Sequence, residues 1–152
     1  MPPRQIAEDP SKAPKSEQNI GVVYRMLSVV SPFAFEEVVA EVFRAMGYPK
    51  VRVTGQSHDG GIDIRAERAA LGSIERIVIQ CKRKEQVGVE VARELLGTVS
   101  ANPQISEGFL VTSGTLSQAC KDFVAEHGRL AFLDGVELAK RMIEFKIPFT
   151  DS

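Results

Sequence analysis

The sequence has little of the residues from which several common kinds of site are built: no tryptophan, two cysteines and two histidines among 152 residues. Cys81 and Cys120 are too far apart, and have too little histidine around them, for a structural zinc site or a disulfide framework, so we expect reduced thiols. No stretch reaches the ~20 consecutive apolar residues that a membrane helix needs, and the N-terminal segment lacks the basic-then-apolar order of a secretory signal. The sequence therefore predicts a cytoplasmic protein with no membrane partner.

An excess of charge of one sign is also missing. Lys and Arg total 19 against 20 for Asp and Glu, which gives a formal net charge of −1. A polyanion such as DNA would therefore have to bind at a locally basic surface. The segment from Arg65 to Arg93 is the basic part of the chain, with seven basic and four acidic residues and a local net charge of +3. Aromatic residues make up only 7% of the chain, and no aromatic-rich surface for stacking single strands is visible.

The length and the apolar fraction of 43% fit one globular domain. Residues 1–19 hold four of the prolines, a mixture of charges and few large apolar groups, so we expect them to form a flexible tail. Residues 20–152 are then the folded domain.

Apolar periodicity and turn residues divide this domain into helices and strands. Ile20 to Val30 has a short helical pattern, and Ser31-Pro32 caps a second helix that Gly47 ends. Strands are predicted at residues 51–54, 62–66, 77–82, 108–112 and 130–133. Three further helices are predicted at residues 89–99, 116–127 and 136–145. A turn at residues 57–61 makes the first two strands a hairpin, and three antiparallel strands are expected. The predicted fold is α/β, a mixed central sheet flanked by helices in the order α-β-β-β-α-β-α-β-α.

Polar side chains collect at one end of the predicted strands. Gln80 and Lys82 are two residues apart and share a strand face, whereas Cys81 points the other way. Asp63 lies on the neighbouring strand between Ile62 and Ile64, which we expect to face opposite to it and to be buried. A carboxylate, an amide and an ammonium group are therefore expected to meet.

The helix that starts at Ser31 supplies a further acid. At 100° per residue, its apolar stripe ends near Phe43, and Glu36 falls at the border of that stripe, while Glu37 and Glu41 lie in the solvated half. Oxygens from Asp63, Gln80 and Glu36 suit Mg²⁺, which prefers carboxylate, carbonyl and water ligands. A bound metal with a neighbouring lysine is the equipment that phosphodiester hydrolysis needs.

Several motifs occur together in one order: Phe35-Glu36 with Gly47-Tyr48, then Asp59-Gly60-Gly61-Ile62-Asp63, Gln80-Cys81-Lys82-Arg83 and Val111-Thr112-Ser113-Gly114. In this order and spacing, the region from about Pro32 to Arg141 resembles the catalytic domain of Mrr-type restriction endonucleases, of the PD-(D/E)xK nuclease superfamily. The resemblance implies a restriction-endonuclease-like core. In the motif PD-(D/E)xK, a proline precedes the first acid, whereas in this sequence Ile62 precedes Asp63.

The resemblance also implies roles for individual residues. Asp63 is then the first acid of the motif, Gln80 takes the place of the second acid, Lys82 is the catalytic lysine and Glu36 is the acid carried by the helix. The backbone carbonyl of Cys81 is an additional metal ligand. Mg²⁺ is the expected cofactor, Mn²⁺ is expected to substitute for it, and double-stranded DNA is the expected partner.

Three readings of the function stay open at this point. The first is a metal-dependent DNA endonuclease, the second a DNA-binding relative of the same fold that does not cleave, and the third a structure-specific nuclease acting on junctions. Mrr-like enzymes usually carry a fused DNA-reading module, and the ~30 residues before Ser31 are too few for a winged helix. Target choice, a fused or separate recognition module and pairing into a homodimer are therefore left open.

Overall fold

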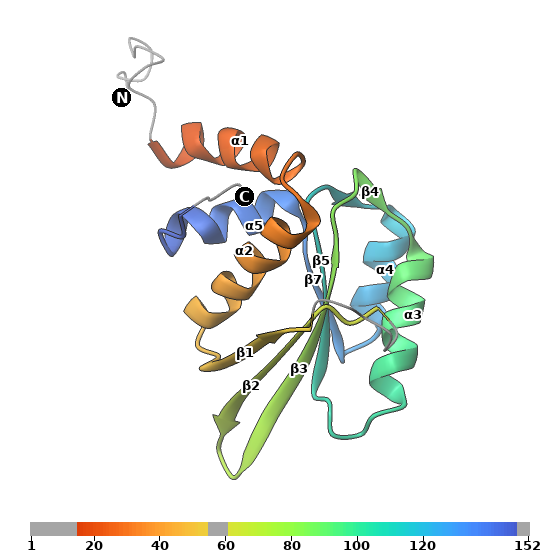
Figure 1. The fold of residues 1–152 in the computed structure, drawn as a ribbon. Helices are drawn as coiled ribbons and strands as arrows, with labels where there is room; N and C mark the ends of the chain where they lie inside the picture. The colour runs from red at the N-terminus through yellow and green to blue at the C-terminus, as the bar shows by residue number, and fades with distance from the viewer. Residues whose placement is uncertain (1–14, 55–60, 149–152) are drawn as a thin grey trace, which may run out of the picture.

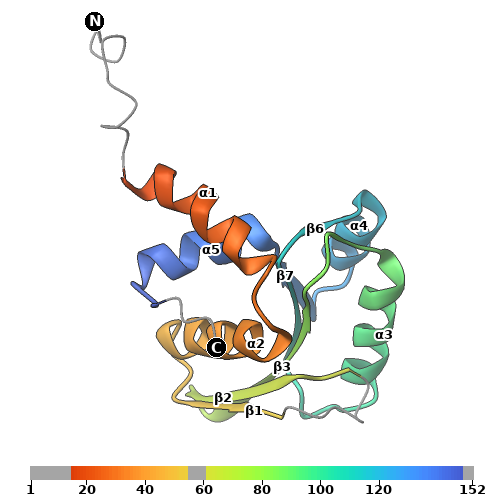
Figure 2. The ribbon, with the colours of Figure 1, turned by 45° about the horizontal axis from the view of Figure 1, so that its top comes forward.

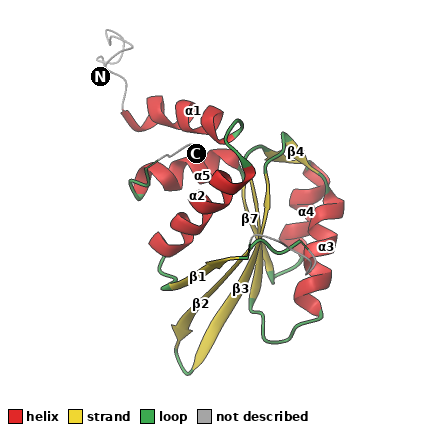
Figure 3. Ribbon diagram, in the orientation of Figure 1, coloured by secondary structure: helices red, strands yellow, loops and turns green. Residues whose placement is uncertain are grey.

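A computed structural model describes residues 15–54 and 61–148, which build a five-stranded mixed sheet between two layers of helices (Figure 1, Figure 3). The strand order is β1-β2-β3-β5-β7. The bounds are β1 Lys50–Val53, β2 Ile64–Ala70, β3 Ser73–Lys82, β5 Glu107–Thr112 and β7 Leu130–Leu133. β1, β2 and β3 pair antiparallel, whereas β5 and β7 run parallel to β3. The predicted mixed sheet and its three antiparallel strands are confirmed.

The helices divide between the two faces of this sheet. One face is covered by α1, α2 and α5, and the other by α3 and α4 (Figure 2). The bounds are α1 Lys15–Leu27, α2 Pro32–Ala45, α3 Val89–Ser100, α4 Gln118–Glu126 and α5 Gly135–Glu144. Helix α3 connects β3 to β5 and α4 connects β5 to β7, as parallel strands require a crossover. Within residues 15–54 and 61–148, no helix has the length and apolar character needed to cross a bilayer.

Helix α2 begins and ends as its sequence predicts. The Ser31 hydroxyl accepts a hydrogen bond from the Ala34 N–H at 3.0 Å, and Pro32 occupies the first helical position. Gly47 follows the helix with φ of +108°, a left-handed conformation that favours glycine. The cap fixes where α2 starts, and so fixes which of its acids face the sheet.

Strand β3 separates two hydrophobic cores by simple alternation. Ile77 and Ile79 pack with α2 and α5, and Cys81 contacts the same core. Val78 packs on the opposite side with α3 and α4. The predicted separation of Cys81 from the Gln80 face is confirmed, because successive strand residues point to opposite sides of a sheet.

Three details differ from the sequence predictions. Helix α1 starts at Lys15, so residues 15–19, expected in the tail, are helical, while residues 1–14 lie outside the described part of the chain. Two short strands, β4 (Gln86–Val87) and β6 (Thr115–Leu116), form a second small sheet, and this pairing keeps Leu116 out of the helix predicted to contain it. Most of the turn predicted at 57–61 also lies outside the described residues.

Candidate active site

Asp63 is held at the point where regular pairing between β2 and β3 stops. The Asp63 carbonyl accepts the Thr54 N–H at 2.8 Å, and the Asp63 N–H is donated to the Ile79 carbonyl at 2.9 Å. Its carboxylate Oδ2 accepts the Cys81 N–H at 2.8 Å. The residue is therefore fixed between the end of β1 and the end of β3 by main chain and side chain together.

The predicted strand alternation around Asp63 is wrong. Ile62 packs in the core beside α3 and α4, whereas Ile64 packs in the core beside α2 and α5. The two isoleucines thus lie on opposite sides of the sheet, because β2 begins only at Ile64 and Ile62 and Asp63 lie outside the regular strand. In this position, the Asp63 carboxylate accepts the Cys81 N–H and meets Glu36 of α2.

Glu36 reaches Asp63 from helix α2, and a hydrogen bond joins the two carboxyl groups. The pKa of Glu36 is raised to about 7. The largest cause is desolvation by burial, followed by the negative charges of Asp63 and Glu37 and the hydrogen bond with Asp63. Burial also raises the pKa of Asp63, although the Cys81 N–H, the Lys82 ammonium and the hydrogen bond with Glu36 lower it in part. Two partly desolvated acids side by side are the arrangement that a bound cation stabilises.

Lys82 lies at the end of β3, half-buried, where its ammonium acts electrostatically on Asp63. The strand end that carries it is braced by β5, since the Ser113 N–H is donated to the Lys82 carbonyl at 3.2 Å. The structure thus brings together Glu36 of α2, Asp63 before β2 and Lys82 of β3.

Gln80 lies on the face of β3 that is turned toward α3 and is almost completely buried. Its Nε2 donates to Oε1 of Glu94 on α3 at 3.3 Å, which fixes the orientation of the amide. Its Oε1 is buried and receives no hydrogen bond from the described residues. Buried acceptors are rarely left unpaired in proteins, so this oxygen is a candidate ligand atom.

Gly61 makes room for the Gln80 amide. A Cβ built on Gly61 would lie 2.4 Å from Gln80 Nε2, and the glycine has φ of +79°. Both the space and the backbone conformation therefore require glycine here.

The donor set fits a hard divalent cation. Among residues 15–54 and 61–148, no cluster of three or more His, Cys, Asp or Glu side chains is placed to hold a metal. A metal here would therefore need neutral oxygens besides the neighbouring Asp63 and Glu36 carboxyl groups. The unpaired Gln80 Oε1 is such an oxygen, and the chemistry of these donors suits Mg²⁺ or Mn²⁺. Burial raises the pKa of the Cys81 thiol well above its usual range, so a neutral thiol stands beside the site.

Sequence reasoning missed one residue of this constellation, Glu94. Its position on α3 carries no periodicity signal, because Glu94 is a surface acid in an amphipathic helix. Only the packing of α3 against the sheet shows that it meets Gln80.

The chain was compared with models of known protein families, with curated proteins and with solved structures. Residues 27–142 match the family model Mrr_cat, described as restriction endonuclease. Comparison with curated proteins found no match.

Solved structures with similar folds include two restriction endonucleases. The DNA modification-dependent restriction endonuclease AspBHI gives a TM-score of 0.63 at 18% identity, over 89% of this chain and 37% of that one. MspJI restriction endonuclease, solved in complex with a 27-mer oligonucleotide, gives 0.52 at 17% identity, over 88% and 32%. AF1548, a protein of unknown function, gives 0.59 at 16% identity, over 79% and 72%. The chain thus spans about a third of the length of the two endonucleases.

Proposed function

This chain belongs to the Mrr_cat restriction endonuclease family, and from that premise we propose that it is a metal-dependent DNA endonuclease that hydrolyses phosphodiester bonds at the Asp63 site. The observation that carries the proposal is the convergence of Glu36, Asp63 and Lys82 from three parts of the chain. Two residues before Lys82 on β3, the buried Gln80 Oε1 lacks a partner among the described residues. Double-stranded DNA is the proposed substrate, and the proposal places the enzyme in the cytoplasm.

Each residue has a role that follows from its surroundings. Asp63, Glu36, Gln80 Oε1 and the Cys81 carbonyl would hold the cation, for which we propose Mg²⁺, with Mn²⁺ as a substitute. When bound, the metal acts as a Lewis acid toward the phosphate and lowers the pKa of water. The Cys81 N–H, donated to Asp63, holds that carboxylate in place. Lys82 contributes a positive charge next to Asp63, where it stabilises negative charge that develops on the attacked phosphate.

The limited span of the chain relative to AspBHI and MspJI bears on target choice. We propose that a separate or fused module supplies recognition of the DNA target, and that two copies pair when both strands are cut. The catalytic domain alone then binds DNA chiefly through contacts to the sugar-phosphate backbone of the DNA.

A plasmid nicking assay tests the proposal. With Mg²⁺ or Mn²⁺, wild-type protein is expected to convert supercoiled plasmid to open circle, and Asp63→Asn and Lys82→Met are expected to lower the rate by at least 100-fold, since each removes a group that acts at the reacting phosphate. Lys140→Gln on α5 is the matched control and should cleave like wild type.

Two outcomes contradict the proposal. A wild type as inactive as the variants shows a DNA-binding relative that does not cleave. Cleavage of a four-way junction at a rate far above that of linear duplex shows a structure-specific nuclease.

A further inference from the structure

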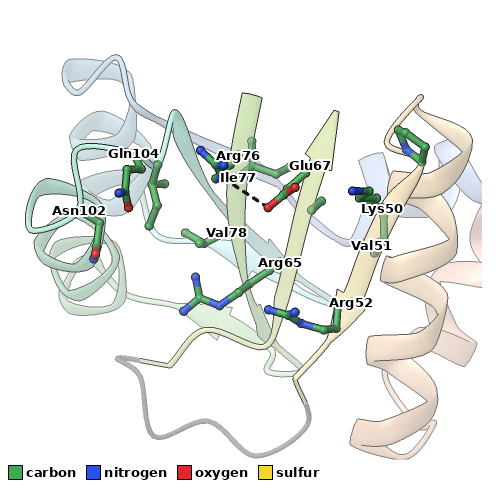
Figure 4. Close-up of a pocket in the computed structure, with 13 residues that line it drawn as sticks. Lys50, Val51, Arg52, Arg65, Glu67, Arg76, Ile77, Val78, Asn102 and Gln104 are labelled. Carbon is green, nitrogen blue, oxygen red and sulfur yellow. Dashed lines mark hydrogen bonds and ion pairs between the residues drawn. The ribbon is translucent and has the colours of Figure 1, made fainter. Parts of the chain in front are cut away.

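A groove of about 560 Å³ opens on the sheet. Its lining includes Arg65, two residues after Asp63, and Val78, two residues before Gln80. Its floor is the face of β1, β2 and β3 that is turned toward α3, and its far wall is the loop after α3 (Figure 4). Its polar lining comprises Lys50, Arg52, Arg65, Glu67, Arg76, Asn102 and Gln104. The groove exists because α2 packs over β1 and β2 on the opposite face, while α3 and α4 pack over β5 and β7.

The lining is strongly basic in a chain whose formal net charge is −1. Four cationic side chains face one carboxylate, Glu67, which pairs with Arg76 at 3.3 Å. Arg52 and Arg65 lie directly opposite each other on neighbouring strands, and Figure 4 shows both side chains extending over the same face of the sheet. In the described part of the chain, neither Lys50 nor Arg52 forms an ion pair. A concave surface with this charge attracts a polyanion.

The groove is continuous with the catalytic strand. Arg76 and Val78 line it, and the next residues on the same face of β3 are Gln80 and Lys82. At about 3.3 Å per residue, Arg76 to Lys82 spans roughly 20 Å, which matches about six nucleotides of duplex at 3.4 Å each.

The far wall of the groove is held rigidly. Asn102 and Gln104 lie in the loop after α3, and Nη2 of Arg129 donates to the carbonyls of Val99, Asn102 and Ile105. The loop and the C-terminal end of α3 are therefore fastened to the start of β7.

We propose that this groove binds the sugar-phosphate backbone of the DNA duplex that flanks the cleaved bond. The inference deepens the proposed nuclease function and rests on it. Lys50, Arg52 and Arg65 neutralise phosphates, and the side-chain amides of Asn102 and Gln104 donate hydrogen bonds to phosphate or sugar oxygens. Such contacts position the duplex on the strand that carries Gln80 and Lys82, without reading its sequence.

Binding is measured with the full chain and a fluorescently labelled 20-base-pair duplex, in EDTA so that no cleavage occurs, over a series of salt concentrations. The double variant Lys50→Gln with Arg52→Gln is compared with a control of equal charge change, Lys121→Gln with Lys140→Gln, whose residues lie on α4 and α5 outside the groove. The groove variant is expected to bind roughly tenfold more weakly, whatever the duplex sequence, with a salt slope lower by about 2. The control should stay within about twofold of wild type.

Cleavage then checks that the groove serves the same reaction. With Mg²⁺ and limiting plasmid, cleavage by the groove variant is expected to slow by about as much as its binding weakens, whereas the control variant should cleave at the wild-type rate. Melting temperatures of both double variants check that each is folded, and the single variant Arg52→Gln replaces the double variant where folding is impaired.

Three results overturn the inference: no binding of duplex by wild type, equal binding by groove and control variants, or displacement of the duplex by micromolar deoxynucleoside triphosphate, which shows a small-molecule pocket instead. Failure of the proposed function looks different. In that case the groove variant loses DNA binding as expected, but wild type cleaves no DNA with any divalent metal.

Discussion

Gly61 is the residue where backbone shape and site chemistry meet most directly. A methyl group there faces both a positive φ of +79° and the buried Gln80 amide at 2.4 Å, whereas Gly72 has a similar φ of +76° with nothing within 4 Å. We expect Gly72→Ala to lower the free energy of unfolding by about 1 kcal/mol, from backbone strain alone. Gly61→Ala should cost roughly 1 kcal/mol more and reduce plasmid nicking, because the amide is displaced. Urea denaturation of both variants and the nicking assay check this, and equal losses of stability with full activity would contradict the close approach.

The Gln80 amide depends in turn on the carboxylate that orients it. Replacing Gln80 by Glu brings a buried carboxylate against the exposed carboxylate of Glu94, whose Oε1 now accepts a hydrogen bond from Gln80 Nε2 at 3.3 Å. Without metal, we expect Gln80→Glu to lower the free energy of unfolding by roughly 1–3 kcal/mol, since the donor is lost and like charges meet. Adding Glu94→Gln should recover at least half of that loss, whereas adding Glu90→Gln on the same helix should recover none. Equal recovery by both would show a general charge effect.

At this scale, sequence reasoning gave part of the site for reasons that can be named. Helical angles placed Glu36 at the edge of the apolar stripe, and it does reach Asp63. Alternation failed at Ile62, since the two-residue period holds only within a regular strand and β2 begins only at Ile64. Glu94 was out of reach, because its partner comes from tertiary packing.

Among the elements, the contact between α3 and β5 is the one most sensitive to volume. A Cβ on Gly108 of β5 would lie 2.7 Å from Val99 Cγ2 and 3.1 Å from Leu95 Cγ, whereas one on Gly97 of α3 meets nothing within 4 Å. We expect Gly108→Ala to destabilise by roughly 1–3 kcal/mol through overpacking. Gly97→Ala should stabilise by about 0.5–1 kcal/mol, because alanine favours the helix. Urea denaturation midpoints of the two variants check the signs, and a stabilising Gly108→Ala would show that α3 and β5 are not packed this closely.

The length of an element decided whether the sequence predicted it. Helix α2 has a capping serine, a proline and a long apolar stripe, and its bounds were predicted within a residue. Strands β4 and β6 have two residues each, too few for any periodicity to show. Their pairing arises from long-range contact between the segments after β3 and after β5.

For the whole molecule, metal binding and folding stability are linked. A cation that binds only the folded chain stabilises it by about 1.4–2.7 kcal/mol at 10 to 100 times its Kd, which for a domain of this size raises the Tm by roughly 3–8 °C. We expect this shift for wild type with Mg²⁺ or Mn²⁺, measured by calorimetry. Asp63→Asn should show no shift. In EDTA its Tm should equal or exceed that of wild type, because burial raises the pKa of Asp63 and so disfavours its charged form.

An equal metal shift in Asp63→Asn and wild type would place the cation elsewhere. A large fall in the Tm of Asp63→Asn in EDTA would instead give Asp63 a structural role. Lys140→Gln is the control for both measurements and should behave as wild type does.

The three carbonyls gathered by Arg129 have a kinetic consequence. A loop that is already tied to two neighbouring elements loses little conformational freedom when a ligand arrives, so complex formation needs no slow rearrangement of that wall. The encounter rate is then governed by long-range attraction and falls as ionic strength rises. Removing the guanidinium with Arg129→Met would convert a rapid, salt-controlled association into one delayed by the reordering of residues 101–105.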